Sequence, residues 1–306
     1  MSDSTASLRR KIHSAVDLQS VVRTMKALAI SSIGQYEQSV LALTDYYRAV
    51  ALGLGVCFRE SEAEGLRPER KRQTATAMVG AVVFGSDQGL VGQFNEVVAD
   101  YALKTLAALP GTPQVWAVGE RVHGRLADAG LPMMGLFSVP NSVKAITPLV
   151  GRILVESGTN GSAAARFTAG QDEDAELHLF YNRPISGEGY EPAHQRLLPL
   201  DGIWCRELAK LPWPTKTPPE IMGNGTTTLR ELIHEYLFVS LFRACAESLA
   251  SENASRLAAM QRADKNINEL LDDLNGKFHR LRQSAIDEEL FDVVSGFEAL
   301  SNTKGH

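Results

Sequence analysis

The segment 85–95, GSDQGLVGQFN, contains the residues whose types and spacing could most readily do chemistry. A glycine-rich turn between a strand and a helix can cradle a phosphate, because the helix N-terminus presents unpaired N–H groups to an anion. Here the glycines follow the pattern GxxxGxxG, which is neither GxGxxG nor a P-loop, and no Lys-Ser or Lys-Thr follows. The simpler interpretation is a tight structural turn, in which glycines let the strand and the helix approach closely.

Other residue types that could form a catalytic or metal centre are scattered along the chain. Ser86 and Asp87 have no histidine nearby in sequence, so we interpret them as a local turn or cap rather than a nucleophile. No two of the seven histidines lie at i, i+4, and the three cysteines form no CxxC. We therefore expect no metal site, no cofactor and no catalytic site of the chain's own.

The elements that would position the glycine turn lie between about residues 74 and 215, where short apolar runs alternate with helical stretches. The predicted strands are 77–84, 114–118 and 176–181, and the predicted helices are 94–109, 119–130 and 142–157. Strand alternating with helix favours a small α/β layer with a largely parallel sheet. Residues 159–174 read as a loop or hairpin, and 202–222 as a proline-rich connection.

A far longer element follows this region. From Leu229 to Ala285 apolar residues recur at alternating three- and four-residue steps, and only Arg243, Asn253 and Asp264 interrupt them. A mean spacing of 3.5 predicts one stripe of a coiled-coil helix, roughly 85 Å long. The spacing of Thr228 and Glu231 suggests a capping box at its start.

A matching pattern lies at the other end of the chain. It runs from Leu8 to Cys57 in the same steps, with only Gln19 and Lys26 polar on the stripe. Two helices of matched period at opposite ends of one chain most simply form an antiparallel coiled coil. A parallel pair would require the connecting residues to span the whole coil. The predicted fold class is therefore α/β with long terminal helices.

The predicted organisation has five parts: an N-terminal coiled-coil helix at 1–60, a basic loop at 61–73, a central α/β domain at 74–201, a proline-rich linker at 202–227 and a C-terminal coiled-coil helix at 228–300. The net charge of −5 gives no support for nucleic-acid binding. No run of 18 uninterrupted apolar residues predicts a membrane span, and the first residues lack the apolar core of a secretory signal. The three cysteines suit a reducing compartment.

Four segments carry a resemblance to a known family. They are VRTMKALA at 22–29, SDQGLVGQFN at 86–95, ESLASENASRLAAM at 247–260 and RLRQSAIDEELFDVVSG at 280–296. They resemble, in order and over nearly the whole chain, motifs of the gamma subunit of F-type ATP synthases, the rotating central stalk. The last two are the most specific.

The resemblance implies a Rossmann-like central domain beside the antiparallel coiled coil. The coil would stand inside the ring of alpha and beta subunits, and the central domain would contact the epsilon subunit and the membrane c-ring. The chain would couple ion flow to ATP synthesis or hydrolysis by rotation. It would have no catalytic site, no nucleic-acid partner and no direct membrane insertion, and would lie on the cytoplasmic face of a bacterial inner membrane.

The resemblance also implies functional residues. It maps rotor contacts with the beta subunits onto Met25, Lys26, Arg256, Arg282, Gln283, Asp287 and Glu289, and a structural glycine turn onto Gly85, Asp87, Gly89 and Gly92. Other interpretations remain open: Met25 could pack between the helices, the two arginines could be solvated charges, and Lys26 could set the register of the seam.

The chain departs from the family's pattern in several places. Residues 31–38 carry no positive charge and include Gly34, which should cost about 1 kcal/mol in mid-helix. Val91 replaces a cysteine, and Asp287 replaces the usual threonine. These departures favour a divergent bacterial branch, such as the alternate ATPase of some bacteria.

Two hypotheses from other classes remain. A free-standing coiled-coil scaffold or tether would form a stable homodimer in isolation. A small nucleotide-binding Rossmann-type enzyme with helical arms would show saturable binding of ATP or NAD.

Overall fold

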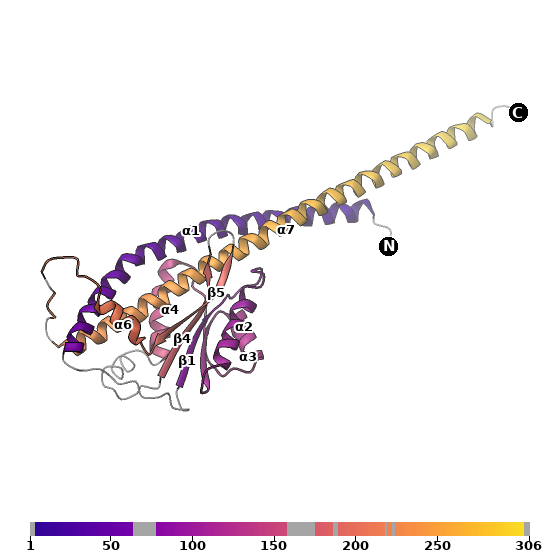
Figure 1. The fold of residues 1–306 in the computed structure, drawn as a ribbon. Coiled ribbons are helices and arrows are strands. Elements are labelled where there is room, and N and C mark those ends of the chain that lie inside the picture. Colours follow the sequence, from indigo (N-terminus) through magenta and orange to yellow (C-terminus); the bar gives the residue numbers. More distant parts are fainter. Residues whose placement is uncertain are drawn as a thin grey trace. The chain divides into compact units, whose positions relative to one another are not determined.

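The computed structural model describes residues 4–63, 78–157, 175–185, 189–217, 219–221 and 224–302 (Figure 1). The chain divides into two compact units. The first, called here the coil unit, combines the two ends of the chain, residues 1–28 and 257–306. The second, the central unit, comprises residues 29–256.

The central unit is built on one five-stranded sheet. Its strands are β1 (Met78–Phe84), β2 (Pro113–Val118), β3 (Met133–Phe137), β4 (Ala175–Pro184) and β5 (Tyr190–Leu198), in the order β3-β2-β1-β4-β5. The first four are parallel, and β5 pairs with β4 in the antiparallel sense. The order and the parallel pairing confirm a Rossmann-like domain with a largely parallel sheet.

The three strands predicted from apolar runs are confirmed as β1, β2 and β4. Strands β3 and β5 were not predicted. Both lie at sheet edges. Strand β3 (MMGLF) is apolar but only five residues long, and β5 carries Glu191, His194 and Arg196, which weaken its apolar signal.

Helices cover both faces of this sheet. On one face α2 (Phe94–Ala107) and α3 (Glu120–Asp128) pack against inward-facing residues of β1 and β2, among them Val79, Ala81 and Val115. On the other face lie α4 (Val143–Glu156) and the parts of the terminal helices that belong to this unit. The three predicted helices correspond closely to α2, α3 and α4.

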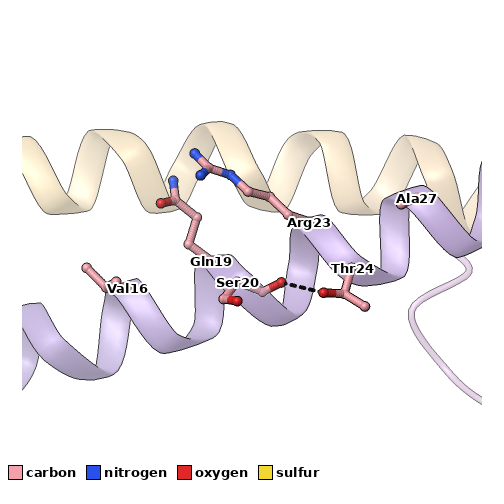
Figure 2. Close-up of a pocket in the computed structure, with 6 residues that line it drawn as sticks. All are labelled: Val16, Gln19, Ser20, Arg23, Thr24 and Ala27. Carbon is pink, nitrogen blue, oxygen red and sulfur yellow. Dashed lines mark hydrogen bonds between the residues drawn. The ribbon is translucent and has the colours of Figure 1, made fainter.

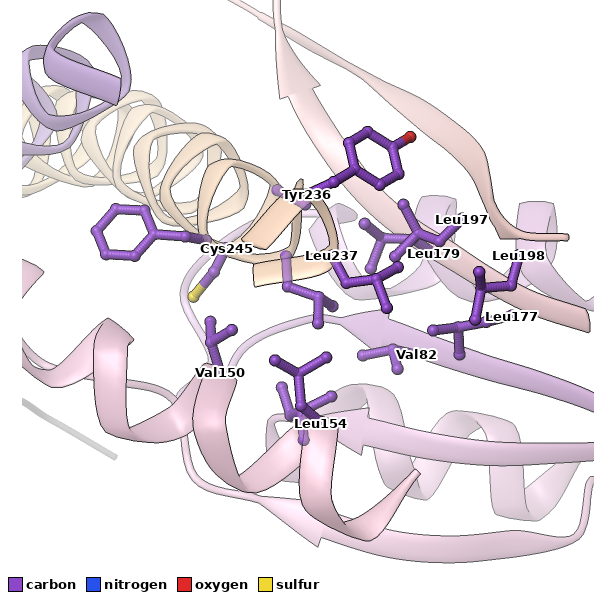
Figure 3. Packing of buried hydrophobic residues seen from close by; sticks show 14 of the residues in the cluster. Val82, Val150, Leu154, Leu177, Leu179, Leu197, Leu198, Tyr236, Leu237 and Cys245 are labelled. Carbon is purple, nitrogen blue, oxygen red and sulfur yellow. The ribbon is translucent and has the colours of Figure 1, made fainter. Parts of the chain in front are cut away.

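The second face carries the larger core. Leu237 and Cys245 of the C-terminal helix point toward Val150 of α4 and toward Leu177 and Leu179 of β4 (Figure 3). All five side chains are less than 5% exposed. The same helix that was recognised from its coiled-coil stripe therefore also serves as a core helix of the α/β domain.

The terminal helices are α1 (Thr5–Ala63) and α7 (Gly225–Asn302). Within the central unit, Gly53 lies against Leu232 and the Tyr46 hydroxyl donates to Glu235 Oε2 at 2.6 Å. From the first pair to the second the residue number falls along α1, from 53 to 46, and rises along α7, from 232 to 235, so the two helices run antiparallel here.

The coil unit shows the same direction independently. The Arg9 guanidinium lies 5.5 Å from the centre of the Phe278 ring, and Gln19 Nε2 donates to Asn268 Oδ1. Val22, Met260 and Ile267 form the buried seam beside them. The antiparallel pairing predicted from the two apolar ladders is confirmed.

Two details of the prediction were wrong. Helix α7 begins at Gly225, where Asn224 Oδ1 accepts a hydrogen bond from the Thr226 amide at 3.0 Å, so Thr228 lies inside the helix and is not its cap. The proline-rich connection contains a further helix, α6 (Gly202–Ala209), capped by Asp201. Its eight residues are too few to give a clear period.

Other predictions fall on residues outside the described part. These are the loop or hairpin at 159–174 and most of the basic loop, from residue 64 onward. The domain boundaries stay predictions.

One stretch of α1, within Thr5–Glu60, matches a membrane-spanning helix in length and mean hydropathy (1.3), and 33% of that stretch is buried within the protein. This is a weak indication, because core helices of proteins that never enter a bilayer pass the same test.

Two glycines of α1 in the central unit should respond oppositely to alanine. A Cβ at Gly34 meets nothing within 4 Å, so Gly34→Ala should raise the free energy of unfolding by about 0.5–1 kcal/mol. A Cβ at Gly55 would lie 2.4 Å from the Leu208 carbonyl oxygen, so Gly55→Ala should lower it by about 1–3 kcal/mol. Urea unfolding of the full chain measures both, and equal shifts of the same sign would contradict this packing.

Candidate functional site

The glycine turn lies between the end of β1 and the start of α2. A Cβ at Gly85 would fall 2.4 Å from Val122 Cβ and 2.7 Å from Asn95 Oδ1, so no larger residue fits there. Gly92 has φ = 58°, in the left-handed region that favours glycine. At Gly89 the nearest atom to an added Cβ is a terminal nitrogen of Arg121, 3.7 Å away, so this position is not sterically required.

Ser86 is held inside the turn by a closed set of hydrogen bonds. Its amide donates to Asn95 Oδ1 at 2.9 Å, and its hydroxyl accepts from Asn95 Nδ2 at 2.9 Å. The same hydroxyl donates to the Gln88 carbonyl. The residue is 0% exposed. Because its proton is directed at a carbonyl rather than a base, Ser86 acts in the turn and not as a nucleophile.

Asp87 binds two other loops of the sheet's carboxyl edge. Its Oδ1 accepts from the Glu120 amide at 3.0 Å, and its Oδ2 accepts from the Val139 amide at 2.9 Å. Glu120 is the first residue of α3, so the carboxylate lies at the N-terminus of that helix, where the helix dipole favours a negative charge.

The turn is also attached to α7 and to the sheet. The Ser255 hydroxyl donates to the Val91 carbonyl, and Asn182 Nδ2 donates to the Phe94 carbonyl at 2.8 Å. In both hydrogen bonds the acceptor is a backbone oxygen, of the turn in the first and of the first residue of α2 in the second. The turn therefore has a defined position relative to α7 within the central unit.

Arg256, a residue implied as a beta-subunit contact, forms an ion pair with Glu252, which lies one turn earlier on α7. Its guanidinium donates to Glu252 Oε1 at 2.7 Å, and the arginine side chain is 15% exposed. Burial raises the pKa of Glu252, Arg256 opposes this shift, and the Asp87 carboxylate adds to it. The structure therefore gives Arg256 an internal role, which is to neutralise a buried carboxylate.

Met25 and Lys26 lie at the seam of the coil unit. Met25 is half-buried and packs against the Val22–Met260–Ile267 cluster. Lys26 Nζ lies 3.8 Å from Asp264 Oδ2, and Arg23 Nε lies 3.5 Å from Asp264 Oδ1. Asp264 and Lys26, both polar on their predicted stripes, are thus paired with each other.

Next to this ion pair, Gln19 and Arg23 extend from α1 toward α7 along a shallow hollow whose other lining residues include Val16 and Thr24 (Figure 2). A polar contact at a coiled-coil seam specifies register, because a slip would leave its partners unpaired. The Gln19–Asn268 hydrogen bond and the Asp264 ion pairs supply such contacts.

The other implied contacts, Arg282, Gln283, Asp287 and Glu289, lie on a part of α7 where every described side chain from 279 to 295 is exposed. The large apolar residues exposed there are Leu281, Ile286, Leu290, Phe291, Val293 and Val294. Ile286, Leu290 and Val293 share one face by their helical spacing. This apolar face, which we call the tip stripe (Ile286, Leu290, Val293), was not predicted, because the ladder was followed only to Ala285.

Among the described residues no group of three or more His, Cys, Asp or Glu side chains is placed to hold a metal ion.

Asp87→Asn tests whether the carboxylate holds the loops together. Asparagine offers one acceptor oxygen, so one of the two amides of Glu120 and Val139 would face an NH₂ group. We expect the free energy of unfolding to fall by about 1–3 kcal/mol. Asp100→Asn is the matched control, because Asp100 is 61% exposed and forms only a surface pair with Arg125, worth about 1 kcal/mol or less. Equal losses in the two variants would contradict a bridging role for Asp87.

Comparison with known proteins places these features in a family. A family model described as ATP synthase matches residues 4–300. The ATP synthase gamma chain of Nitrosomonas eutropha is 25% identical over 310 residues, covering 97% of this chain and 99% of the relative. That of Leifsonia xyli subsp. xyli is 28% identical over 303 residues, covering 96% and 97%.

Solved structures agree on the fold. A chain from the Euglena gracilis mitochondrial ATP synthase, in an assembly titled OSCP/F1/c-ring, superposes with a TM-score of 0.62 at 16% identity and covers 99% of this chain and 96% of its own. A chain from the Tetrahymena thermophila central stalk and c-ring gives a TM-score of 0.53 at 21% identity, covering 79% and 99%. With a family model that matches nearly its whole length, the chain belongs to the ATP synthase family, among the gamma chains.

Proposed function

We propose that this chain is the central rotor stalk of an F-type ATP synthase, and that it transmits rotation between an ion-driven c-ring and the alpha and beta subunits. The tip stripe is the observation that carries this proposal. It is an apolar helical face that nothing in the described chain covers. A protein ring around α7 would cover it.

A helix is only marginally stable in water unless another element or protein packs against it. Most helical stability in proteins comes from tertiary packing, and short isolated helices are marginal in water. Residues 279–295 are all exposed in the described chain, so a stable helix there needs a partner that packs on it.

The surroundings of the tip stripe suit a protein partner better than a lipid bilayer. Charged residues Arg282, Asp287 and Glu289 lie at the same level of the helix as the tip stripe. Charges within the hydrocarbon of a membrane are costly, whereas a protein ring can offer polar contacts beside an apolar sleeve. The residues implied as beta-subunit contacts thus flank the apolar face that needs covering.

The N-terminal helix shows a related surface. In the coil unit Val16, Leu18, Val21 and Leu28 are 47–63% exposed, while Asp17 and Arg23 lie between them. We propose that this surface, too, faces the alpha and beta subunits.

The internal contacts support a mechanical rather than a catalytic role. The Ser86 hydroxyl is hydrogen-bonded within the turn, and the Asp87 carboxylate accepts hydrogen bonds from the backbone of two other loops. We propose that nucleotide chemistry takes place on the ring, and that the coil acts by presenting different faces to the ring's subunits. Contacts that differ between states are what shift a conformational equilibrium.

The remaining partners follow from the family. We propose that the central unit contacts the epsilon subunit and the c-ring, and that the complex lies on the cytoplasmic face of a bacterial inner membrane. The glycine turn lacks the GxGxxG and P-loop spacings, which argues against the alternative of a Rossmann-type nucleotide enzyme. The uncovered tip stripe is expected of a rotor and of a scaffold alike. The two hypotheses can be distinguished only by identifying the proteins that bind the chain.

Purification of the tagged chain from its native cell distinguishes the two hypotheses. The rotor proposal predicts that alpha, beta and epsilon subunits accompany it, with one copy of the chain in each ring. A homodimer without these subunits would support a scaffold. Saturable binding of ATP or NAD at about micromolar levels to the isolated chain, or about −8 kcal/mol of binding free energy, would support an enzyme.

The tip stripe can be tested in the assembled complex. Ile286→Ser with Leu290→Ser and Val293→Ser should weaken the hold of the ring on the stalk, since each buried aliphatic side chain contributes about 1.5–3 kcal/mol. ATP hydrolysis coupled to proton or sodium pumping should fall at least about tenfold in reconstituted vesicles.

The matched control is Glu288→Ser with Asp292→Ser on the opposite side of the same helical segment. It removes charge without removing apolar contact. If the control loses as much coupled activity as the tip-stripe variant, or neither loses any, the proposed apolar contact is wrong.

A further inference from the structure

A hydrogen-bonded chain of one carboxylate and two imidazoles crosses strands β4 and β5, and neither the motifs nor the proposed function uses it. Glu176 and His178 share a face of β4, because residues two apart in a strand point the same way. His178 Nε2 lies 2.9 Å from Glu176 Oε2, and His178 Nδ1 lies 2.8 Å from His194 Nε2.

Burial differs sharply along this chain. Glu176 is 7% exposed and His178 is 2% exposed, and both belong to an internal strand. His194 lies on the edge strand β5 and is exposed. Its ring stacks on that of His178, with centroids 5.1 Å apart at 14°, and on Phe180, with centroids 4.8 Å apart at 16°.

The number of protons that this chain can hold is limited by its geometry. The proton between Glu176 and His178 belongs to His178 Nε2, since a carboxylate accepts. Only one proton fits between His178 Nδ1 and His194 Nε2. The two rings together can therefore be neutral, or carry one positive charge, with the hydrogen bond intact. If both rings are charged, two N–H groups face each other across 2.8 Å and the bond is lost.

With one charged imidazole the chain balances the charge of Glu176. This arrangement explains how a carboxylate and a histidine can both be buried in the sheet. Among the described residues no second carboxylate is hydrogen-bonded to either ring, so a second proton has no acidic partner there. Its lowest-cost position is on His194, the one ring that can turn toward solvent.

We propose that the Glu176–His178–His194 chain is a proton-operated latch, in which a second proton breaks the His178–His194 bond, turns His194 outward and loosens the edge strand β5. The inference is independent of the proposed rotor function. It concerns the surface that the central unit presents at its β5 edge, which would gain a positive charge beside Arg196.

The surroundings of His194 disfavour a charged imidazole in the stack, so a charged His194 should turn toward solvent. Burial within the stack lowers the pKa of His194, and His178 and then Arg196 lower it further. On this face β1 presents Val79, Ala81 and Val83, which carry no charge. Helix α2 contributes the Tyr101 ring against Phe180 at 6.3 Å, and its charged residues Glu96, Asp100 and Lys104 are exposed.

The sign of the pH effect follows from this direction. The unfolded chain binds the proton first, because its histidine has the ordinary pKa of about 6.5. Stability contributed by neutral His194 is therefore present above that pH, and it is lost as the pH falls through the ordinary pKa toward the lowered one.

Hydrogen–deuterium exchange of the full chain, corrected for the intrinsic effect of pH, tests the latch. Between about pH 7.5 and about pH 5.5, amides of β5 should lose about two- to tenfold of their protection, the value of one hydrogen bond. Amides of β1 should not follow. His194→Gln, whose amide can still donate to His178 Nδ1 but cannot titrate, should abolish the change.

His13→Gln is the matched control. His13 is 80% exposed and lies on α1, so this variant removes a titrating imidazole far from β5 in sequence and should behave like the unmodified chain. The proposal is overturned if β5 protection in the unmodified chain does not change with pH beyond that of β1. It is also overturned if His194→Gln retains the full change.

Discussion

The pairing of α1 with α7 is the interaction on which both units depend, because neither helix can bury its stripe alone. In the coil unit the two helices are each other's only described partners, and Leu8, Ala15 and Leu274 are buried there in addition to the seam of Val22, Met260 and Ile267. In the central unit the same two helices cover one face of the sheet together with α4. The hydrogen bond from Ser255 of α7 to the glycine turn therefore depends on the packing of α7 against α1.

Register within the pair is set by polar contacts rather than by the apolar stripe. A stripe of repeating apolar residues accepts a one-heptad slip at little cost, whereas Asp264 would lose Arg23 and Lys26. The same principle operates in the central unit, where Asp87 joins three loops through two amides. In both units a carboxylate fixes the relative position of separate segments of the chain.

Much of this architecture was predictable from periodicity, since the two ladders and the strands β1, β2 and β4 lie in strongly patterned segments. The edge strands were not, because β5 mixes His194 and Arg196 with apolar residues and β3 has only five residues. The histidine pair was missed for the same reason. His178 and His194 are sixteen residues apart, and only the unpredicted β4–β5 pairing joins them.

The candidate site shows a similar division. Motif resemblance indicated Lys26 and Arg256, but only coordinates show that Asp264 and Glu252 pair with them. The tip stripe was missed because an apolar pattern in a helix does not say whether its partner lies in the same chain. Exposure of Leu290 and Val293 decides that question, and exposure is a property of the fold.

Crosslinking at the seam tests the central claim most directly. With Cys57, Cys205 and Cys245 replaced by alanine, Gln19→Cys with Asn268→Cys should react rapidly with a short thiol–thiol crosslinker, because these residues are hydrogen-bonded across the seam. Gln19→Cys with Gln261→Cys, about 10 Å farther along α7, should react slowly or not at all. Equal yields in the two pairs, or a higher yield with residue 261, would contradict the antiparallel register on which the account rests.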